Sequence, residues 1–344
     1  MDLSSLPMLW GQLAILAGVI LVSATQLAKS ADIIAFKTGL GRSFVGVVLL
    51  ATATSLPELG TGISSVTIIG GASGADLAAG DAFGSNLFNL LIIGILDLLW
   101  RRGSILATLG SSVALVGLLG AGVIVIAGGA ILIHNSLNLG FGLPISPVSI
   151  VLALVFAVAL YAVYREEQST ENAEPEHDYS DSSLKRAVLI YGTAAVIVVV
   201  AAVRLAHTGE GLAEAMGWER SFVGTQFLAL STSLPELAAS VAAIRIMAPE
   251  LAITNLLGSN LFNMGFVLFL DDAAYVDGPI WAAVSPIHAL TAAIAVLMTM
   301  VVLVPVVSKA KTSIGRVVTI ESSLLISLYV IASLLVFYSG RGGH

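Results

Sequence analysis

Two stretches of the chain are close copies of two others, and this internal duplication constrains the fold more than any other feature. Residues 42–59 read RSFVGVVLLATATSLPEL and residues 220–237 read RSFVGTQFLALSTSLPEL, so 13 of the 18 positions are identical at an offset of 178. A second block, GSNLFN, stands at 84–89 and again at 258–263. Chance does not produce two such pairs in the same order, and the chain is therefore predicted to consist of two related halves.

The chain also contains ten apolar runs that are long enough to cross a membrane as helices. Only 11% of its 344 residues are charged, whereas a soluble domain carries about 25%, which excludes an ordinary soluble enzyme. A nucleic-acid binder is excluded because Lys+Arg is 15 against Asp+Glu 22. A bilayer core needs roughly 20 apolar residues of helix. The runs of this size are 7–28, 43–68, 75–99, 105–133, 145–164, 184–206, 221–246, 249–270, 280–306 and 316–338.

Lysine and arginine fall mainly on one side of these predicted helices. Cytoplasmic loops retain such residues, and placing the N-terminus outside puts 12 of the 15 on the cytoplasmic side. Both termini are therefore predicted to lie outside. The polar stretch 165–183 then lies in the cytoplasm and holds seven of the 22 acidic residues. Its composition predicts a disordered acidic linker, with a solvated connector favoured over a cation sensor.

This topology makes the two halves inverted copies of each other. Five spans separate corresponding helices, and an odd number reverses the direction of a helix across the membrane. We predict an all-α membrane protein of ten transmembrane helices, built from two inverted five-helix repeats at 1–164 and 184–344. Inverted repeats place a substrate site at their interface near mid-membrane, in helices that are broken there. The arrangement is typical of a transporter.

Each copy of the longer block places a proline and a glutamate inside an apolar helix. Pro57 and Pro235 each remove a backbone donor, so carbonyl oxygens at 51–54 and in the second copy are expected to be partly free. A packing kink is the alternative. Glu58 and Glu236 follow at a depth where a carboxylate costs several kcal/mol unless it is neutralised. Because two facing carboxylates repel, the pair predicts either a proton on one of them or a cation between them, and a divalent ion meets both at once.

The shorter block adds neutral oxygen atoms to these carboxylates. Ser85 and Asn89 are four residues apart, as are Ser259 and Asn263, so each pair lies on one helical face and can point at the same centre. Six to eight oxygens suit Ca²⁺, and several Na⁺ ions can share the same ligands, whereas Zn²⁺ prefers His or Cys. Interhelical hydrogen bonding is the alternative role for the Ser and Asn pairs. Further hydroxyl groups come from Thr54, Ser55, Thr232 and Ser233.

The duplicated TSLPEL and GSNLFN blocks in a ten-span inverted repeat resemble the α-repeats of the Ca²⁺:cation antiporter superfamily. The resemblance is to the sodium/calcium exchanger family and its prokaryotic members, and it implies a multi-pass protein of a prokaryotic plasma membrane. It implies Ca²⁺ ligands at Glu58 and Glu236 and at the backbone oxygens of Thr54 and Thr232. The two glutamates are also implied at flanking Na⁺ sites, and Asn89 and Asn263 would line the centre. The other implied Na⁺-site residues are Ala51, Ser55, Ser85, Ala229, Ser233 and Ser259.

The function implied is secondary active exchange of Ca²⁺ for Na⁺ by alternating access, in the direction of Ca²⁺ extrusion. Several sodium/calcium exchangers carry Asp at the position of Asn263, so this chain has two central carboxylates where those have three. That departure leaves open H⁺/Ca²⁺ exchange or exchange of another cation pair. Neither a cofactor nor an obligate protein partner is expected, and the partners are the lipid bilayer and the transported Ca²⁺, Na⁺ or H⁺. An intramembrane enzyme is disfavoured because no base has suitable spacing from Ser55 or Ser233.

Other acidic residues receive separate expectations. Asp81 lies one turn before Ser85, and an ion-path role and a helix-start role are both open. Asp76 is expected to cap a helix, and Asp97 to form an interfacial ion pair with a neighbouring arginine. A solvated face in an outer loop is expected for Asp271, Asp272 and Asp277.

Overall fold

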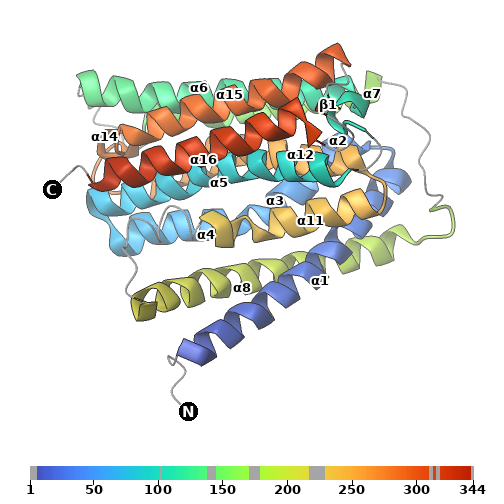
Figure 1. Ribbon diagram of the computed structural model, residues 1–344, viewed down its shortest axis with the longest axis horizontal. Coiled ribbons are helices and arrows are strands. Elements are labelled where there is room, and N and C mark those ends of the chain that lie inside the picture. The colour runs from blue at the N-terminus through green and yellow to red at the C-terminus, as the bar shows by residue number, and fades with distance from the viewer. Residues whose placement is uncertain are drawn as a thin grey trace.

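The computed structural model describes residues 6–100, 103–137, 145–169, 179–216, 229–309, 313–314 and 318–341, and this part of the chain is almost entirely helical (Figure 1). Its β-structure consists of two short strands, β1 (Ser313–Ile314) and β2 (Val318–Thr319), which pair antiparallel just before the last helix. The all-α prediction is confirmed for these residues.

The helices of the first half follow the order of the predicted apolar runs. The second run forms one bent passage rather than a uniform helix, because α-helical and π-helical segments alternate along it. The elements are α1 (Leu6–Thr38), α2 (Arg42–Val45), η1 (Gly46–Ala51), α3 (Thr52–Thr54), α4 (Leu56–Ser64), η2 (Ser65–Ile69), α5 (Gly71–Leu99), η3 (Leu106–Thr108), α6 (Ser111–Leu137) and α7 (Pro147–Ser169).

The helices of the second half also follow the order of the predicted apolar runs. The starts of the predicted runs 221–246 and 316–338 lie outside the described residues. The elements are α8 (Leu184–Met216), α10 (Ala229–Thr232), α11 (Leu234–Arg245), α12 (Pro249–Phe262), η5 (Asn263–Val267), α13 (Leu268–Ala274), α14 (Ile280–Ala283), α15 (Ile287–Ser308) and α16 (Ile320–Arg341). Within the described residues, seven helices are long and apolar enough to cross a membrane, or eight if the bent passage 42–69 counts as one span.

The two halves interlock around a central pair of helices. Figure 1 shows α5 and α12 in the middle, between α4 and α11 on one side and α15 and α16 on the other, with α1 and α8 side by side at the edge. The most apolar window is 72% buried in the helix containing α5 and 83% in the one containing α12, against 17% in α1. Apolar side chains of α1 are therefore exposed where lipid would lie, whereas α5 and α12 form the core.

Corresponding helices of the two halves make corresponding contacts. The first helices, α1 and α8, pack on each other, and so do the fourth, α6 and α15. The last helix of each half has an exchanged position, which means that it packs on the other half: α7 packs on η5 and α13 of the second half, and α16 packs on α5 of the first half. Each half thus covers the core helix of the other.

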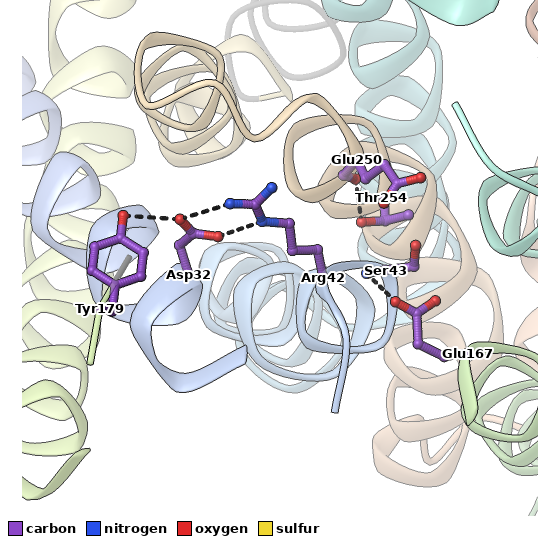
Figure 2. Close-up of polar contacts among 7 residues, drawn as sticks. All are labelled: Asp32, Arg42, Ser43, Glu167, Tyr179, Glu250 and Thr254. Carbon is purple, nitrogen blue, oxygen red and sulfur yellow. Dashed lines mark hydrogen bonds and ion pairs between the residues drawn. The ribbon is translucent and has the colours of Figure 1, made fainter. Parts of the chain in front are cut away.

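A polar cluster holds the corner between α1 and α2 (Figure 2). Asp32 is buried and pairs with Arg42, whose Nε lies 2.6 Å from Oδ1. The Tyr179 hydroxyl donates to Asp32 Oδ2 at 3.0 Å. Burial, together with the charge of Asp32, raises the pKa of Tyr179 to about 12, so the phenol stays protonated as a donor at neutral pH. Beside this pair, the backbone N–H of Ser43 donates to Glu167 Oε1 at 3.3 Å.

These contacts correct part of the expectation for the acidic linker. Residues 165–169 continue α7 as helix rather than forming a disordered segment, and Glu167 is buried. At the other end of the linker, Lys37 Nζ donates to the carbonyl oxygen of Ser180 at 2.6 Å. The middle, 170–178, lies outside the described residues. Both described ends of the linker are therefore held against the corner between α1 and α2.

Candidate functional site

The two proline-containing helices break at equivalent serines. Ser55 stands between α3 and α4 with φ −93° and ψ 6°, and Ser233 stands between α10 and α11 with φ −86° and ψ 6°. In the first copy the two parts of the helix are bent by 41°. Pro57 and Pro235 lie in the first turn after each break, where proline is tolerated. The predicted broken helices are thus present in both halves.

Helical hydrogen bonding continues up to each break, which refines the expectation of free carbonyls. Ser55 N–H donates to the carbonyl oxygen of Ala51 at 2.9 Å, and Ser233 N–H donates to that of Ala229 at 3.0 Å. These two carbonyls therefore keep their helical donors, contrary to the expectation. Pro57 has no N–H to donate to the carbonyl oxygen of Ala53, four residues earlier. The carbonyl that loses its helical hydrogen bond therefore lies closer to Ser55 than Ala51 does.

The two copies of the repeated TSLPEL motif meet because each serine reaches the glutamate of the other half. Ser233 Oγ donates to Glu58 Oε1 at 3.2 Å, and Ser55 Oγ donates to Glu236 Oε1 at 3.0 Å. Ser259 Oγ also donates to Glu236 Oε1, at 3.3 Å. Both glutamates are buried, with exposed fractions of 1% and 0%, and are close enough to repel each other when both are charged. The structure therefore brings both predicted carboxylates to one interface between the halves.

The threonines beside the serines form a second reciprocal pair. Thr54 Oγ1 donates to Asn255 Oδ1 at 3.3 Å, and Thr232 Oγ1 donates to Asp81 Oδ1 at 3.2 Å. Asp81 lies eleven residues into α5, so a helix-start role is wrong for it. It is buried next to the central residues, as the ion-path alternative requires.

An amide network that joins α5 to α12 and to the first residue of η5 was not predicted from the sequence. Asn89 Nδ2 donates to Asn260 Oδ1 at 3.0 Å, and Asn263 Nδ2 donates to Asn86 Oδ1 at 3.3 Å. Asn260 Nδ2 adds a bond to the carbonyl oxygen of Asn86 at 3.3 Å. Asn86 and Asn260 occupy the third position of the two GSNLFN blocks, so the repetition itself carried the signal. Their amides orient the predicted asparagines.

Five buried oxygen atoms of the predicted residues have no hydrogen-bond donor within the described part of the chain. They are Glu58 Oε2, Glu236 Oε2, Ser85 Oγ, Asn89 Oδ1 and Asn263 Oδ1. Buried polar atoms are normally paired, so a group of unpaired oxygens around two carboxylates indicates a missing positive partner. Carboxylate, hydroxyl and amide oxygens are the ligands of hard cations such as Ca²⁺.

All twelve predicted site residues are buried, including Ala51 and Ala229, whose contribution is limited to backbone oxygen. In the described residues, no group of three or more His, Cys, Asp or Glu side chains is placed to hold a metal ion. A cation between Glu58 and Glu236 would therefore depend on neutral oxygens for most of its coordination, in agreement with the two-carboxylate composition of the site.

Several acidic residues outside this centre differ from expectation. Asp76 does not cap α5, whose N-cap is Gly70, but accepts Ser285 N–H at 2.8 Å and lies 3.1 Å from His288 Nε2. Asp97 accepts Ile105 N–H at 2.8 Å, and the arginines expected to pair with it, at 101 and 102, lie outside the described residues. The expected solvated acidic face is wrong for Asp271 and Asp272, which are fully buried.

Comparison with known proteins gives consistent matches. The family model described as sodium/calcium exchanger protein matches residues 8–108 and 186–338, which together make up most of the chain. The inner membrane protein YrbG of Escherichia coli K12 is 30% identical over 268 residues, covering 76% of this chain and 79% of YrbG. CaxA of Alkalimonas amylolytica, described as a candidate antiporter, is 28% identical over 265 residues, covering 76% and 80%.

The fold matches a solved structure over nearly the whole chain. The sodium-calcium exchanger NCX_Mj, soaked with Na⁺ and Sr²⁺, superposes with a TM-score of 0.72 at 18% sequence identity, covering 95% of this chain and 98% of NCX_Mj. A second NCX_Mj structure, soaked with 10 mM Na⁺ and no Ca²⁺, gives 0.73 with the same coverage. At this identity the match shows a common fold. Together with the family match and YrbG, it leads to the conclusion that this chain is a membrane transporter belonging to the sodium/calcium exchanger family.

Proposed function

We propose that the protein exchanges Ca²⁺ for Na⁺ across a prokaryotic plasma membrane by alternating access, in the direction of Ca²⁺ extrusion. The observation that carries this proposal is the centre itself, where Glu58 and Glu236 each accept a serine hydroxyl from the opposite half and each keep one unpaired oxygen. Family membership supports a cation antiporter, and the oxygen-only ligand set supports Ca²⁺ and Na⁺ as its substrates.

We further propose ten membrane spans arranged as two inverted repeats. The reciprocal contacts support a pseudo-two-fold relation, because Ser55 to Glu236 has its counterpart in Ser233 to Glu58. The threonine contacts to Asn255 and Asp81 are related in the same way. The exchanged packing of α7 and α16 extends the relation to the outer helices. A site on such an axis can face either side of the membrane through similar rearrangements of the two halves.

In this proposal one Ca²⁺ lies between Glu58 and Glu236, with neutral oxygens of Thr54, Thr232 and the asparagines completing its shell. Na⁺ ions would use the flanking serines and the same carboxylates. An empty centre leaves two charges unneutralised in a low dielectric, which costs several kcal/mol per ion. The transition between the two access states is therefore penalised when the site is empty, and this penalty enforces exchange rather than leak.

Exchange of H⁺ for Ca²⁺ is a second candidate, and Asn263 is the observation that favours it. With Asn at this position, the described centre has two carboxylates, and two protons can neutralise both when Ca²⁺ leaves. Na⁺ binding would instead have to rely on fewer charged ligands.

The two candidates separate in reconstituted vesicles. Uptake of ⁴⁵Ca²⁺ is measured with a Na⁺ gradient while the pH gradient is dissipated, and then with a pH gradient in the absence of Na⁺. Sodium/calcium exchange predicts uptake in the first condition and its absence in the second. Uptake driven by the pH gradient alone would replace the first candidate with the second, and no gradient-driven Ca²⁺ uptake in either condition would refute both.

The ligand assignment is tested by Glu58→Gln and Glu236→Gln. Each variant removes one charge from a buried site without changing side-chain size, and loss of one partner of a buried charge pair costs about 3–5 kcal/mol. We expect each variant to weaken Ca²⁺ binding by at least about 100-fold. Glu166→Gln, at the end of α7, is the matched control and should bind Ca²⁺ as the parent does. Unchanged Ca²⁺ binding in both site variants would refute the site.

A further inference from the structure

Asp271 is a fully buried acidic residue that the central site does not include. It lies in α13, its exposed fraction is 0%, and neither of its carboxyl oxygens has a hydrogen-bond donor in the described part of the chain. Its neighbour Asp272 is also buried but accepts backbone N–H groups from Ser146 at 2.7 Å and Ile280 at 2.8 Å. Asp272 therefore has a structural role, and Asp271 has none that the contacts explain.

The carboxyl group of Asp271 lies directly against the backbone of α4. A Cβ added to Gly62 would lie 2.5 Å and 2.6 Å from its two oxygens, so no side chain fits between them. Gly62 is one helical turn after Glu58, on the same face of α4. The adjacent Thr61 donates to Asp81 Oδ2 at 2.6 Å. Asp271 and Asp81 thus contact two adjacent residues of α4, about one helical turn after a central glutamate.

The second half of the protein has no such pair of acids. Ser240 stands where the first half has Gly62, and Asn255 stands where it has Asp81. Asn255 Nδ2 donates to Ser240 Oγ at 3.0 Å, so this layer is neutral and its polar atoms are paired. The acidic layer is therefore a departure from the symmetry of the repeats, confined to one side of the centre.

A π-helical segment explains how Asp271 reaches this position. Asp97 bonds the N–H eight residues later, at Ile105, and Asp272 likewise bonds the N–H eight residues later, at Ile280. The residue numbers of Asp97 and Asp272 differ by 175, whereas those of the two GSNLFN blocks differ by 174. The extra residue falls at η5, since a π-helical turn inserts one residue into an α-helix. Asp271 then corresponds to Leu96, an apolar residue of the first half.

The charged groups around Asp271 are all acidic. Among the elements packed against α13, α5 contributes Asp81, whose charge would repel that of Asp271. The helix α4 contributes Glu58, whose charge and that of Asp81 would repel each other. The segments η2, η5 and α14 carry no charged residue, and α7 carries its charges only at its far end, 165–167. Asp272 lies on α13 itself. No lysine, arginine or histidine of the described chain forms an ion pair with Asp271.

We propose that Asp271 binds a proton and that its proton occupancy sets the cation affinity of the neighbouring central site. A charged carboxylate that is buried without a donor costs several kcal/mol, so a positive partner is needed. The carboxyl group touches Gly62, and a proton is the partner that needs no space there. Loss of the proton adds a negative charge beside Asp81 and one turn from Glu58, and this charge strengthens cation binding. This linkage rests on the proposed cation site at Glu58 and Glu236.

The test compares Ca²⁺ binding to the purified full-length protein as a function of pH. Asp271→Asn has nearly the same shape as a protonated aspartate and cannot release a proton. For the parent we expect the Ca²⁺ affinity to rise between about pH 5 and about pH 9 as Asp271 loses its proton. The part of the rise that is due to Asp271 should be at least about fivefold, which is the lower end of typical coupling between two sites. The asparagine variant should lose this part of the rise. Asp277→Asn, which removes an exposed acid from the same connection, should keep it.

A second readout does not depend on the proposed function. Difference infrared spectra of the parent, recorded on raising the pH, should show loss of a protonated carboxyl C=O band, and Asp271→Asn should lack that band. If the band and the pH dependence both persist in the variant, the proposal is overturned. If the band is lost but Ca²⁺ does not bind to the parent at any pH, the proton site stands and the proposed function fails.

Discussion

At the scale of single residues, the most informative contacts are those that cross from one half to the other. Each central glutamate accepts a hydroxyl from the serine of the opposite break, at 3.2 Å for Glu58 and 3.0 Å for Glu236. A hydrogen bond to a charged group contributes about 1.5–3 kcal/mol. The serines therefore stabilise the charged carboxylates and fix which oxygen of each remains unpaired.

We predict that Ser55→Ala and Ser233→Ala each weaken Ca²⁺ binding by about tenfold to 100-fold, because each variant removes one such bond. Ser233→Ala also leaves Glu58 Oε1 unpaired, whereas in Ser55→Ala the Glu236 Oε1 atom keeps the bond from Ser259. Calorimetric titration of the purified variants measures the change. Ser64→Ala is the control, since Ser64 Oγ bonds only within its own helix, to Gly60 O at 2.7 Å. A large loss in one serine variant with none in the other would contradict the reciprocal arrangement.

Repetition allowed the central residues to be predicted, and it also explains what was missed. Glu58 and Glu236 stand out because a carboxylate recurs after proline in an apolar helix. Asn86 and Asn260 recur as well, but a repeated asparagine gives no hint of its partner, which is an asparagine of the opposite block. At the constant offset of 174, Asp271 aligns with Asp97, but one inserted residue shifts the register, so Asp272 makes the bond equivalent to that of Asp97 and Asp271 corresponds to an apolar position. Its burial depends on tertiary packing against Gly62, which no local pattern shows.

At the scale of elements, glycines let the broken helix approach the core helix of the other half. A Cβ on Gly258 of α12 would lie 2.9 Å from Val47 Cα and 3.1 Å from Ala51 Cβ. A Cβ on Gly46 of η1 would lie 2.1 Å from Thr254 Oγ1. This contact sets the distance between η1 and α12, and thus between the first break and Ser259.

We predict that Gly258→Ala lowers the free energy of unfolding by about 1–3 kcal/mol, the usual cost of inserting a methyl group against rigid backbone. Thermal unfolding in detergent, followed by circular dichroism, measures the change. Gly122→Ala is the control, because nothing lies within 4 Å of its added Cβ, and alanine favours helix over glycine. Equal stability of both variants would show that η1 and α12 separate without cost.

Element boundaries were less predictable than element existence. The proline in TSLPEL predicted a break, and the break is present at Ser55 and Ser233. The acidic composition of 165–169 predicted a disordered linker, yet these residues continue α7 because Glu167 is buried and accepts the N–H of Ser43. The π-helical segments leave no signal in the hydropathy pattern.

At the scale of the whole molecule, the side of the membrane that the acidic layer faces depends on how the chain is inserted. The distribution of lysine and arginine predicts that both termini and Asp277 lie outside and the linker inside. Under that orientation α4 runs outward from Glu58, and the acidic layer of Asp81 and Asp271 lies between the centre and the outside. The neutral layer of Asn255 and Ser240 then lies toward the cytoplasm. Orientation therefore decides which solution sets the proton occupancy of Asp271.

The chain contains no cysteine, so a single introduced thiol reports its own side of the membrane. We predict that Asp277→Cys reacts with a membrane-impermeant maleimide in intact cells, whereas Asp181→Cys reacts only in inverted vesicles. Both positions are exposed, so lack of reaction would reflect the membrane rather than burial. The cysteine-free parent supplies the background, and unchanged Ca²⁺ binding shows that each variant is folded. The reverse labelling pattern would invert the chain, place the acidic layer on the cytoplasmic side, and make cytoplasmic pH the variable that Asp271 follows.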